Sequence, residues 1–433
     1  MGLVGTAATV DAVAGWIDAC AGGVAGKRTG LPNLFPAFPG FTADSPFRAE
    51  VEIRDRYSVE IPVRRLHELA AIADPARGAA ELFKREVDDI LSKGRPDVFV
   101  YALPSEILDL TDPRDEGDQG TKASGGGAER PSDLHDLSKA LGLASGVPVQ
   151  LVRPETTGIR AKRRSFRGTE RRLQDNATRA WNFHVALYYK ASGTPWRLAR
   201  EPNELTTCYV GVSFYRSEDN RTLQTSIAEV FNERGQGVVI RGGPARTDRD
   251  DRVPHLDAAE AYALLRSALA AYRSEHRTLP AGVVLHKTSG HDPGEIDGFS
   301  RAAEDDRIDS LELISIGATS VRLLRYGEYP ALRDTYLELD QREQLVYTRG
   351  SVPYFGTYPG MHVPRPQRIR CDRTESPPVS LADEILALTK MNWNNTQFDG
   401  ASPITIRAAR EVGDILRYVG TDSPIQSSYA FYM

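Results

Sequence analysis

The sequence contains no apolar run of the roughly twenty residues that a membrane-spanning helix needs, which excludes such a helix. Cysteine is scarce as well, because Cys20, Cys208 and Cys371 are the only three in 433 residues. Three widely spaced cysteines provide neither a disulfide framework nor a cysteine-based zinc site, so we expect a reducing, cytoplasmic compartment. The apolar N-terminal stretch has no basic residues before it and therefore fails as a secretory signal.

Lysine is rare among the basic residues: the 54 basic side chains comprise 9 lysines and 45 arginines. With 59 acidic residues the formal net charge is −5, which argues against a protein that coats nucleic acid over its whole surface but leaves a local basic groove open. A composition of 40% hydrophobic and 26% charged residues excludes wholesale disorder. The length fits two domains better than one.

One segment opposes the sign of the whole chain. Residues 160–179 contain eight basic and two acidic side chains, a local net charge of +6. A charge run usually forms a solvated surface, but this reversal of sign favours contact with a polyanion. Within the segment, Arg163, Arg164 and Arg172 are the candidates for contacts with a nucleic-acid backbone.

The first half of the chain alternates predicted strands and helices. Residues 1–40 are rich in glycine and alanine, and the proline- and aromatic-rich segment Asn33–Phe41 predicts an extended N-terminal arm. Residues 41–200 then form a domain for which the pattern predicts a strand or hairpin over 51–61, strands over 97–103 and 147–152, and helices over 76–94, 133–144 (N-cap Ser132) and 180–190. This alternation predicts a small parallel sheet with Rossmann-like layering.

Residues 201–433 are predicted to form a second α/β domain. It opens with an apolar strand over 206–216. Further strands are predicted over 222–231, 237–243, 282–288, 311–317, 321–327, 335–340 and 344–350, and helices over 257–276, 294–304, 381–393 and 404–420. A mixed sheet with helices added late in the chain is compatible with an RNase H-like domain, although pattern alone does not single out that fold.

Several segments together carry a family resemblance. These are NLFPAFPGF, VPVQLV, YYKASGTPW, the strand CYVGVSFYR, and LTKMNWNN followed by a helix that starts with Pro-Ile-Thr. With them the chain resembles the short prokaryotic Argonautes. The resemblance implies an α/β fold in which a Rossmann-like MID domain, residues 41–200, precedes an RNase H-like PIWI domain, residues 201–433.

The resemblance also implies a pocket for the 5′ phosphate of a guide strand. The matching positions are His135, Lys139, Gln150 and Lys190. His135 and Lys139 are four residues apart, so they share one face of the predicted helix. His135 falls in the first helical turn, where backbone N–H groups also favour an anion. Each of the four residues alone has an ordinary structural explanation, and the interpretation rests on their combination.

The C-terminal segment SYAFYM is apolar and aromatic up to Met433. In Argonautes of this type the terminal carboxylate helps to hold a divalent cation against the guide phosphate. The resemblance therefore implies Met433 as a metal ligand and Mg²⁺ as the cofactor, since oxygen-only ligation suits Mg²⁺. Packing of an apolar tail on the core is the alternative explanation.

PIWI domains that cut use acidic side chains to hold two divalent metals, because two such ions within about 4 Å of each other repel unless they are neutralised. The corresponding positions here are Ser213, Thr288 and Ala408, none of which carries a metal-binding carboxylate. The sequence therefore predicts no slicing, and no catalytic residue is assigned.

The function that the resemblance implies is recognition without cleavage. The chain would carry a guide RNA, pair it with single-stranded target DNA from plasmids or phages, and activate a partner in prokaryotic immunity. In the family that partner contains an APAZ domain fused to a TIR, sirtuin-like or nuclease domain. Two alternatives stay open. One is an RNase H-like endonuclease that uses displaced acids such as Glu218, Asp219, Asp292 and Glu295. The other is a Rossmann-type small-molecule enzyme, which the missing glycine fingerprint disfavours.

Overall fold

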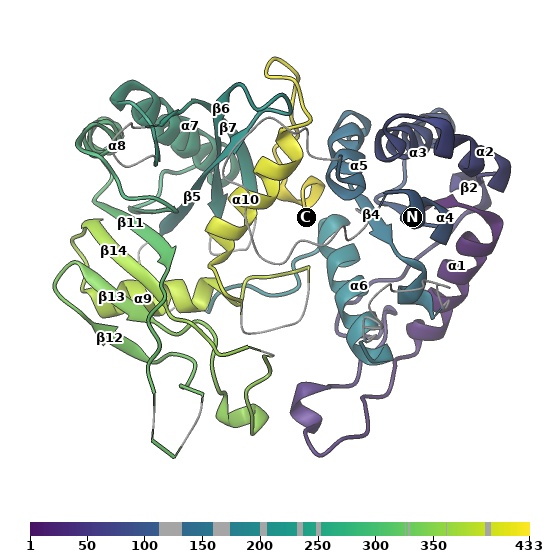
Figure 1. The fold of residues 1–433 in the computed structure, drawn as a ribbon, viewed down its shortest axis with the longest axis horizontal. Helices are drawn as coiled ribbons and strands as arrows, with labels where there is room; N and C mark the ends of the chain where they lie inside the picture. The colour runs from purple at the N-terminus through teal and green to yellow at the C-terminus, as the bar shows by residue number, and fades with distance from the viewer. Residues whose placement is uncertain are drawn as a thin grey trace. The chain divides into compact units, whose positions relative to one another are not determined.

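A computed structural model describes residues 1–111, 132–158, 174–199, 206–231, 237–247, 253–324, 326–327, 330–360, 362–394 and 400–433. The chain forms two compact units, both drawn in Figure 1. Unit 1 comprises Met1–Lys27, Ala37–Gly193 and Tyr418–Ile425, and unit 2 comprises Arg28–Pro36, Thr194–Arg417 and Gln426–Met433. Each unit therefore contains segments from both halves of the sequence.

Unit 1 is built on a four-stranded parallel sheet in the order β2-β1-β3-β4. Its elements are β1 (Gly2–Gly5), α1 (Ala7–Ala21), β2 (Ser58–Glu60), α2 (Val63–Glu68), α3 (Pro75–Leu91), β3 (Phe99–Ala102), α4 (Ser105–Thr111), α5 (Leu134–Gly142), β4 (Val149–Val152) and α6 (Asn176–Lys190). The parallel sheet agrees with the predicted Rossmann-like layering.

The N-terminal residues differ from the expected arm. Strand β1 lies inside the sheet, where Leu3 pairs with Ser58 on one side and Val100 on the other. The short apolar run that was expected to belong to an extended arm is a fully buried strand, and glycine at both ends permits close packing. A Cβ at Gly5 would collide with the Ala102 carbonyl oxygen of β3.

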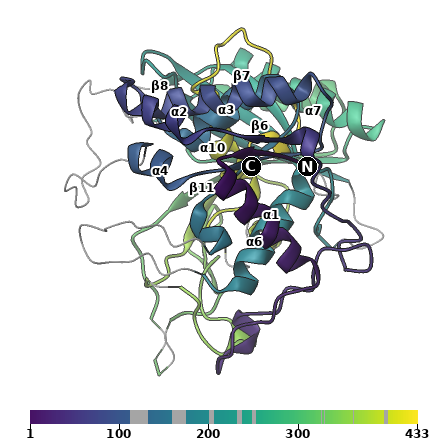
Figure 2. The ribbon, with the colours of Figure 1, turned by 90° about the vertical axis from the view of Figure 1, so that its right-hand side faces the viewer.

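Helices cover both faces of this sheet, as Figure 2 shows for α3 on one side and α1 and α6 on the other. On one face Val4, Phe99 and Tyr101 pack against side chains of α3 and α5. On the other face Leu3 and Val100 pack against α1 and α6. Successive strand residues therefore point to opposite, equally buried faces, which is why these strands read as continuous apolar runs.

Residues 37–47 form an aromatic contact with α6. The Phe38 ring stacks on His184 at 4.8 Å between centroids, and Phe41 lies 5.2 Å from the same imidazole. Burial lowers the pKa of His184 to about 4, so the imidazole is neutral in this apolar surrounding. The aromatic residues that suggested an ordered extended segment thus have a definite packing role.

Unit 2 contains an eight-stranded mixed sheet in the order β12-β13-β14-β11-β10-β5-β6-β7, in which β11, β10 and β5 are parallel. Its strands are β5 (Thr207–Arg216), β6 (Leu223–Phe231), β7 (Gly237–Pro244), β10 (Gly282–Lys287), β11 (Ser310–Ala318), β12 (Tyr336–Glu338), β13 (Glu343–Val346) and β14 (Gln367–Arg373). A small second sheet pairs β8 (Arg246–Thr247) with β9 (Pro254–His255). The helices are α7 (Ala258–His276), α8 (Pro293–Asp305), α9 (Pro378–Leu388) and α10 (Ile404–Leu416).

The central strands of unit 2 are covered on both faces. Helices α7 and α8 pack on the face that carries Val210, Leu285 and Leu313. Helix α10 packs on the opposite face, where Gly211 of β5 lies directly against the Thr405 backbone. Only a glycine leaves room for this close approach.

Candidate nucleic-acid interface

Helix α5 begins at an aspartate rather than at the predicted Ser132. Asp133 is the N-cap, and its Oδ1 accepts hydrogen bonds from the backbone N–H groups of His135 at 2.8 Å and Asp136 at 3.3 Å. The Ser132 hydroxyl instead donates to Asp74 at 2.7 Å. This cap places His135 in the first turn of α5 and Lys139 one turn later.

Two lysines are buried in this part of unit 1. Lys139 on α5 and Lys190, the last residue of α6, are each only 3% exposed. The Lys190 ammonium donates a hydrogen bond to Oε1 of Gln150, which lies in the middle of β4. Buried ammonium groups such as these two, and an amide held in one orientation, are suited to bind an anion.

The charges of Lys139 and Lys190 both act on His135. Desolvation lowers the pKa of His135, and the positive charges of Lys139 and Lys190 lower it further, although about half of the side chain is exposed. Its Nδ1 lies 2.8 Å from Oδ1 of Asp136. The structure therefore links the four predicted residues in pairs: Lys190 bonds Gln150, and the charges of Lys139 and Lys190 act on His135. We call these four residues, the predicted guide pocket, the lysine pocket.

A possible metal-binding group adjoins the lysine pocket. Asp133, His135 and Asp136 each offer one ligand atom, and these atoms lie within 4.8 Å of one another. Carboxylate oxygens are the ligands that Mg²⁺ prefers, so the two aspartates fit such an ion. The predicted ligand Met433 belongs to unit 2, where it is 2% exposed and its N–H donates to the Tyr429 carbonyl at 3.1 Å.

In unit 2, two of the three positions that the resemblance matches to metal-binding acids, Ser213 and Thr288, are neighbours. Val212 of β5 and Lys287 of β10 are register partners on adjacent parallel strands. Ser213 and Thr288 follow them directly, so these two positions lie side by side. Neither a hydroxymethyl group nor a threonine side chain supplies the negative charge that two divalent metals require.

The third of these positions, Ala408, is buried in α10. This helix packs on the face of the sheet that carries Gly211. One turn before it, the Thr405 hydroxyl meets Nδ1 of His286 at 2.8 Å. Burial lowers the pKa of His286 to about 3, so this imidazole is neutral at the end of β10. The three positions thus come from β5, the end of β10 and α10, and they carry no carboxylate.

Three of the four acids named as possible displaced ligands have structural roles. The Glu295 carboxylate lies 2.5 and 2.6 Å from the buried Lys287 ammonium. Asp292 caps α8 by accepting a hydrogen bond from the Glu295 N–H at 2.8 Å. Asp219 accepts from Ser217 within an exposed turn. His255, Asp292 and Glu295 do cluster as possible ligands, but the Lys287 cation already lies against Glu295.

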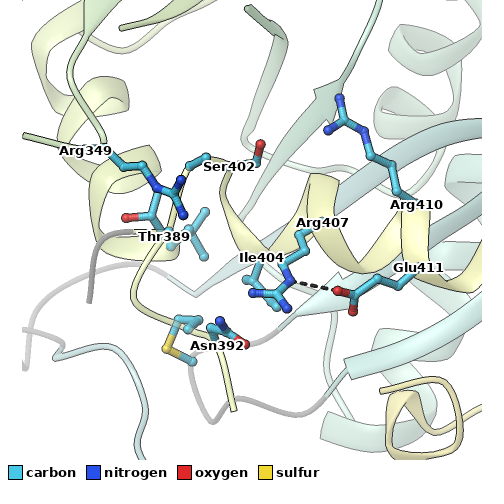
Figure 3. A pocket seen from close by; sticks show the side chains of 12 residues that line it. Arg349, Thr389, Asn392, Ser402, Ile404, Arg407, Arg410 and Glu411 are labelled. Atoms are coloured by element: carbon cyan, nitrogen blue, oxygen red, sulfur yellow. Dashed lines mark hydrogen bonds and ion pairs between the residues drawn. The ribbon is translucent and has the colours of Figure 1, made fainter. Parts of the chain in front are cut away.

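A cavity of about 310 Å³ opens in unit 2 at the start of α10 (Figure 3). Arg349, Arg407 and Arg410 line it together with the acid Glu411. Its remaining lining residues are Leu388, Thr389, Met391, Asn392, Gly400, Ala401, Ser402 and Ile404. Three guanidinium groups and several hydroxyl and amide groups make this arginine pocket suitable for phosphate oxygens.

The LTKMNW segment forms part of the wall of the arginine pocket, and hydrogen bonds hold it in place. The indole of Trp196 donates to the Lys390 carbonyl at 2.9 Å, and the indole of Trp393 donates back to the Trp196 carbonyl at 3.2 Å. Arg333 donates to the Thr389 hydroxyl at 2.7 Å. These contacts fix residues 389–393, so two segments on which the family resemblance rests meet in one structural unit.

The sequence did not single out the arginine pocket. Its signal was present in the amphipathic helix α10, where Arg407 and Arg410 are spaced three residues apart. Arg349 comes from a distant segment that only the tertiary fold brings near. The predicted backbone contacts Arg163, Arg164 and Arg172 lie outside the described residues.

Solved Argonaute structures share this architecture. The structure of Clostridium butyricum Argonaute bound to a guide DNA and a 19-mer target DNA matches with a TM-score of 0.60 at 12% sequence identity, covering 96% of this chain and 48% of that chain. Aa-Ago with externally bound siRNA matches at 0.58 and 14% identity, covering 99% and 50%. A. aeolicus Argonaute also matches at 0.58 and 14%, covering 100% and 49%. The fold is Argonaute-like.

The Argonaute-like fold agrees with the predicted α/β class, a MID domain with a parallel sheet followed by a PIWI domain with a larger mixed sheet. The chain spans about half the length of the Argonautes it matches. No protein-family model and no curated protein match its sequence. Among the described residues, none of the helices combines the length and apolar character needed to cross a bilayer.

Proposed function

We propose that this chain binds a guide RNA and uses it to recognise single-stranded target DNA. The observation that carries the proposal is the lysine pocket, in which the buried Lys190 bonds Gln150 and the buried Lys139 lies one turn after His135 on α5, within an Argonaute-like fold. The pocket would hold the 5′ phosphate of the guide. The arginine pocket would bind backbone phosphates, while base pairing would supply sequence specificity.

Each residue of the lysine pocket has a role in this proposal. The Lys139 and Lys190 ammonium groups neutralise a terminal phosphate, and the hydrogen bond to Gln150 keeps Lys190 oriented before the guide arrives. The lowered pKa leaves His135 neutral at neutral pH, so it contributes hydrogen bonding rather than charge. Asp133 and Asp136 provide oxygen atoms that fit Mg²⁺, which would offset repulsion between these carboxylates and the phosphate.

We further propose that the chain recognises its target without cutting it. Support comes from Ser213, Thr288 and Ala408, which the resemblance matches to the metal-binding positions and which carry no carboxylate. Two-metal cleavage requires several converging carboxylates, and the nearby acids Asp292 and Glu295 are engaged in a helix cap and an ion pair.

The signal of target recognition would then pass to another protein. By the resemblance of its motifs, we propose an APAZ-containing effector with a TIR, sirtuin-like or nuclease domain as the partner, acting in immunity against plasmids and phages. We place this activity in the cytoplasm, where the buried free thiols of Cys20, Cys208 and Cys371 would stay reduced.

Substitution of Lys190 tests the guide-binding proposal. Lys190→Ala should weaken binding of a short 5′-phosphorylated RNA by at least tenfold, because it removes one ammonium group and releases Gln150. The loss should be much smaller for the same RNA with a 5′ hydroxyl. Lys93→Ala, which removes an exposed lysine of unit 1, is the matched control. Equal binding of both RNAs by Lys190→Ala and the unaltered chain would contradict the pocket assignment.

The absence of cleavage is tested separately. The chain loaded with guide RNA should leave a complementary DNA strand intact in the presence of Mg²⁺ or Mn²⁺, as followed by denaturing electrophoresis. A metal-dependent product of defined length would instead support an RNase H-like endonuclease with displaced acids.

A further inference from the structure

Glu411 is the one acidic side chain among the described residues that line the arginine pocket. Its Oε1 lies 2.8 Å from Nε of Arg407, one turn earlier on α10 (Figure 3). Its other oxygen accepts a hydrogen bond from the Tyr429 hydroxyl at 2.6 Å. The carboxylate is therefore fixed from two sides, by the pocket arginine and by a tyrosine outside the pocket.

Tyr429 provides a rigid anchor for this carboxylate. It begins the short 3-10 helix η7 (Tyr429–Phe431) and is only 1% exposed. The side chains of Arg407 and Glu411, in contrast, are 29% and 31% exposed, so both are accessible to a ligand. One half of the network is thus immobilised in the core, whereas the other half faces the pocket.

A carboxylate and a phosphodiester compete for the same guanidinium group. Both are planar or forked oxygen acceptors that bind arginine through short, charge-assisted hydrogen bonds. With Glu411 on its Nε, Arg407 has fewer donors and less net charge to offer to a phosphate. The acid also repels an incoming anion, and the incomplete burial of the pair keeps the ion pair weak enough to exchange.

We propose that Glu411 is a specificity-determining residue of the arginine pocket. It competes with nucleic-acid phosphates for Arg407, and Tyr429 holds it in the competing position. The ligand class is the phosphodiester backbone of a single strand, so this inference rests on the proposed function. Glu411 then suppresses indiscriminate backbone binding, and a strand gains Arg407 only when other contacts hold it in place.

Glu411→Gln tests the competition directly. The amide has nearly the same size and still accepts a hydrogen bond from Tyr429, but it carries no charge to compete for Arg407. Binding of a short single-stranded RNA without a 5′ phosphate should become several-fold tighter at low salt. The plot of log affinity against log salt should steepen by about 0.7, the value for one additional phosphate contact on a single strand.

A double-mutant cycle shows whether the effect of Glu411 on RNA binding acts through Arg407. Arg407→Ala should weaken binding and flatten the salt plot, and adding Glu411→Gln to Arg407→Ala should have a much smaller effect than Glu411→Gln has alone, because only the direct repulsion between the carboxylate and the phosphate is then removed. Tyr429→Phe should shift binding in the same direction as Glu411→Gln but by less. Asp383→Asn removes one negative charge from an exposed position of α9 and should leave the salt plot unchanged.

The outcomes separate the two proposals. If Arg407→Ala leaves RNA binding unchanged, the arginine pocket is not a backbone site and that part of the proposed function fails. If Arg407→Ala weakens binding but Glu411→Gln leaves the salt plot unchanged or flatter, the proposed competition between Glu411 and phosphate is overturned. The arginine pocket then remains a backbone-binding site. Equal effects of Glu411→Gln with and without Arg407 would also overturn the proposed competition. If Glu411 had only a structural role, Glu411→Gln would lower the thermal midpoint of unfolding without altering the salt plot.

Discussion

Among single residues, buried charged side chains are those whose removal should change stability most clearly. Lys287 and Glu295 are both fully buried, and the ammonium also donates to the Gly290 carbonyl at 3.0 Å. Glu295 in turn accepts from the backbone N–H of Leu256 at 2.8 Å. Desolvation lowers the pKa of Lys287, while the Glu295 charge opposes this effect. The pair connects the end of β10 to α8.

Lys287→Met should destabilise unit 2 by about 3–5 kcal/mol, because it leaves a buried carboxylate without its cation. Methionine retains the length of the apolar stem, so loss of charge rather than loss of volume is tested. Adding Glu295→Gln should recover part of the stability. Denaturant unfolding measures both effects, and a single variant as stable as the parent would contradict the importance of the pair.

The residues of the lysine pocket could be proposed from the resemblance of the motifs, whereas those of the arginine pocket could not. His135 and Lys139 share a helix, and Gln150 and Lys190 each fall in a short motif that the sequence displays. The arginine pocket instead combines Arg349 with residues of α10, which is distant from it in sequence. Among 45 arginines, composition offers no means of choosing Arg349, Arg407 and Arg410.

At the scale of elements, α10 depends on one glycine for its position. Gly211 of β5 contacts the Thr405 backbone so closely that a Cβ would overlap the carbonyl oxygen. Because α10 carries Ala408 over the sheet and Arg407 into the arginine pocket, its distance from β5 sets the geometry of both regions.

Gly211→Ala should displace α10, lower the thermal midpoint by several degrees and weaken RNA binding through the arginine pocket. Gly317→Ala is the matched control, because Gly317 also lies in a strand of this sheet and a Cβ there meets nothing within 4 Å. Calorimetry and RNA titration measure the two effects. Similar behaviour of the two alanine variants would contradict the proposed close contact.

Strong apolar periodicity predicted most elements, and its failures have physical causes. The strand expected over 206–216 is β5, and the helix expected over 257–276 is α7, each within one residue. The strand expected over 321–327 does not form in the described residues of that segment, where Leu324 is 83% exposed. Strand β14 escaped prediction because arginines alternate with Ile369 and Cys371 in it, and so it reads as polar.

At the scale of the whole chain, residues far apart in sequence complete one unit. Tyr418 follows α10, yet it belongs to unit 1 and packs against that unit's core. Its hydroxyl accepts a hydrogen bond from the Asp133 N–H at 3.1 Å, across 285 residues of sequence. Asp133 caps α5, so this contact supports the helix that presents His135 and Lys139.

Tyr418→Ala should therefore loosen the first turn of α5, even though the substitution lies far away in sequence. Amide hydrogen exchange of α5 should accelerate, and binding of a 5′-phosphorylated RNA should weaken, while exchange in α7 of unit 2 stays unchanged. Tyr354→Ala, at a tyrosine that is 68% exposed, serves as the control. Uniform acceleration in both units would indicate global destabilisation instead.

The membership of Tyr418–Ile425 in unit 1 also constrains how the protein matures on the ribosome. Strand β1 is the first part of the sheet to leave the exit tunnel, but its partners β2 and β3 emerge only after Ser58 and Phe99 have been translated. The last piece of unit 1 emerges only after nearly all of unit 2. Unit 1 therefore cannot be completed before most of unit 2 has been translated, and the lysine pocket becomes fully supported only after Tyr418–Ile425 have left the ribosome.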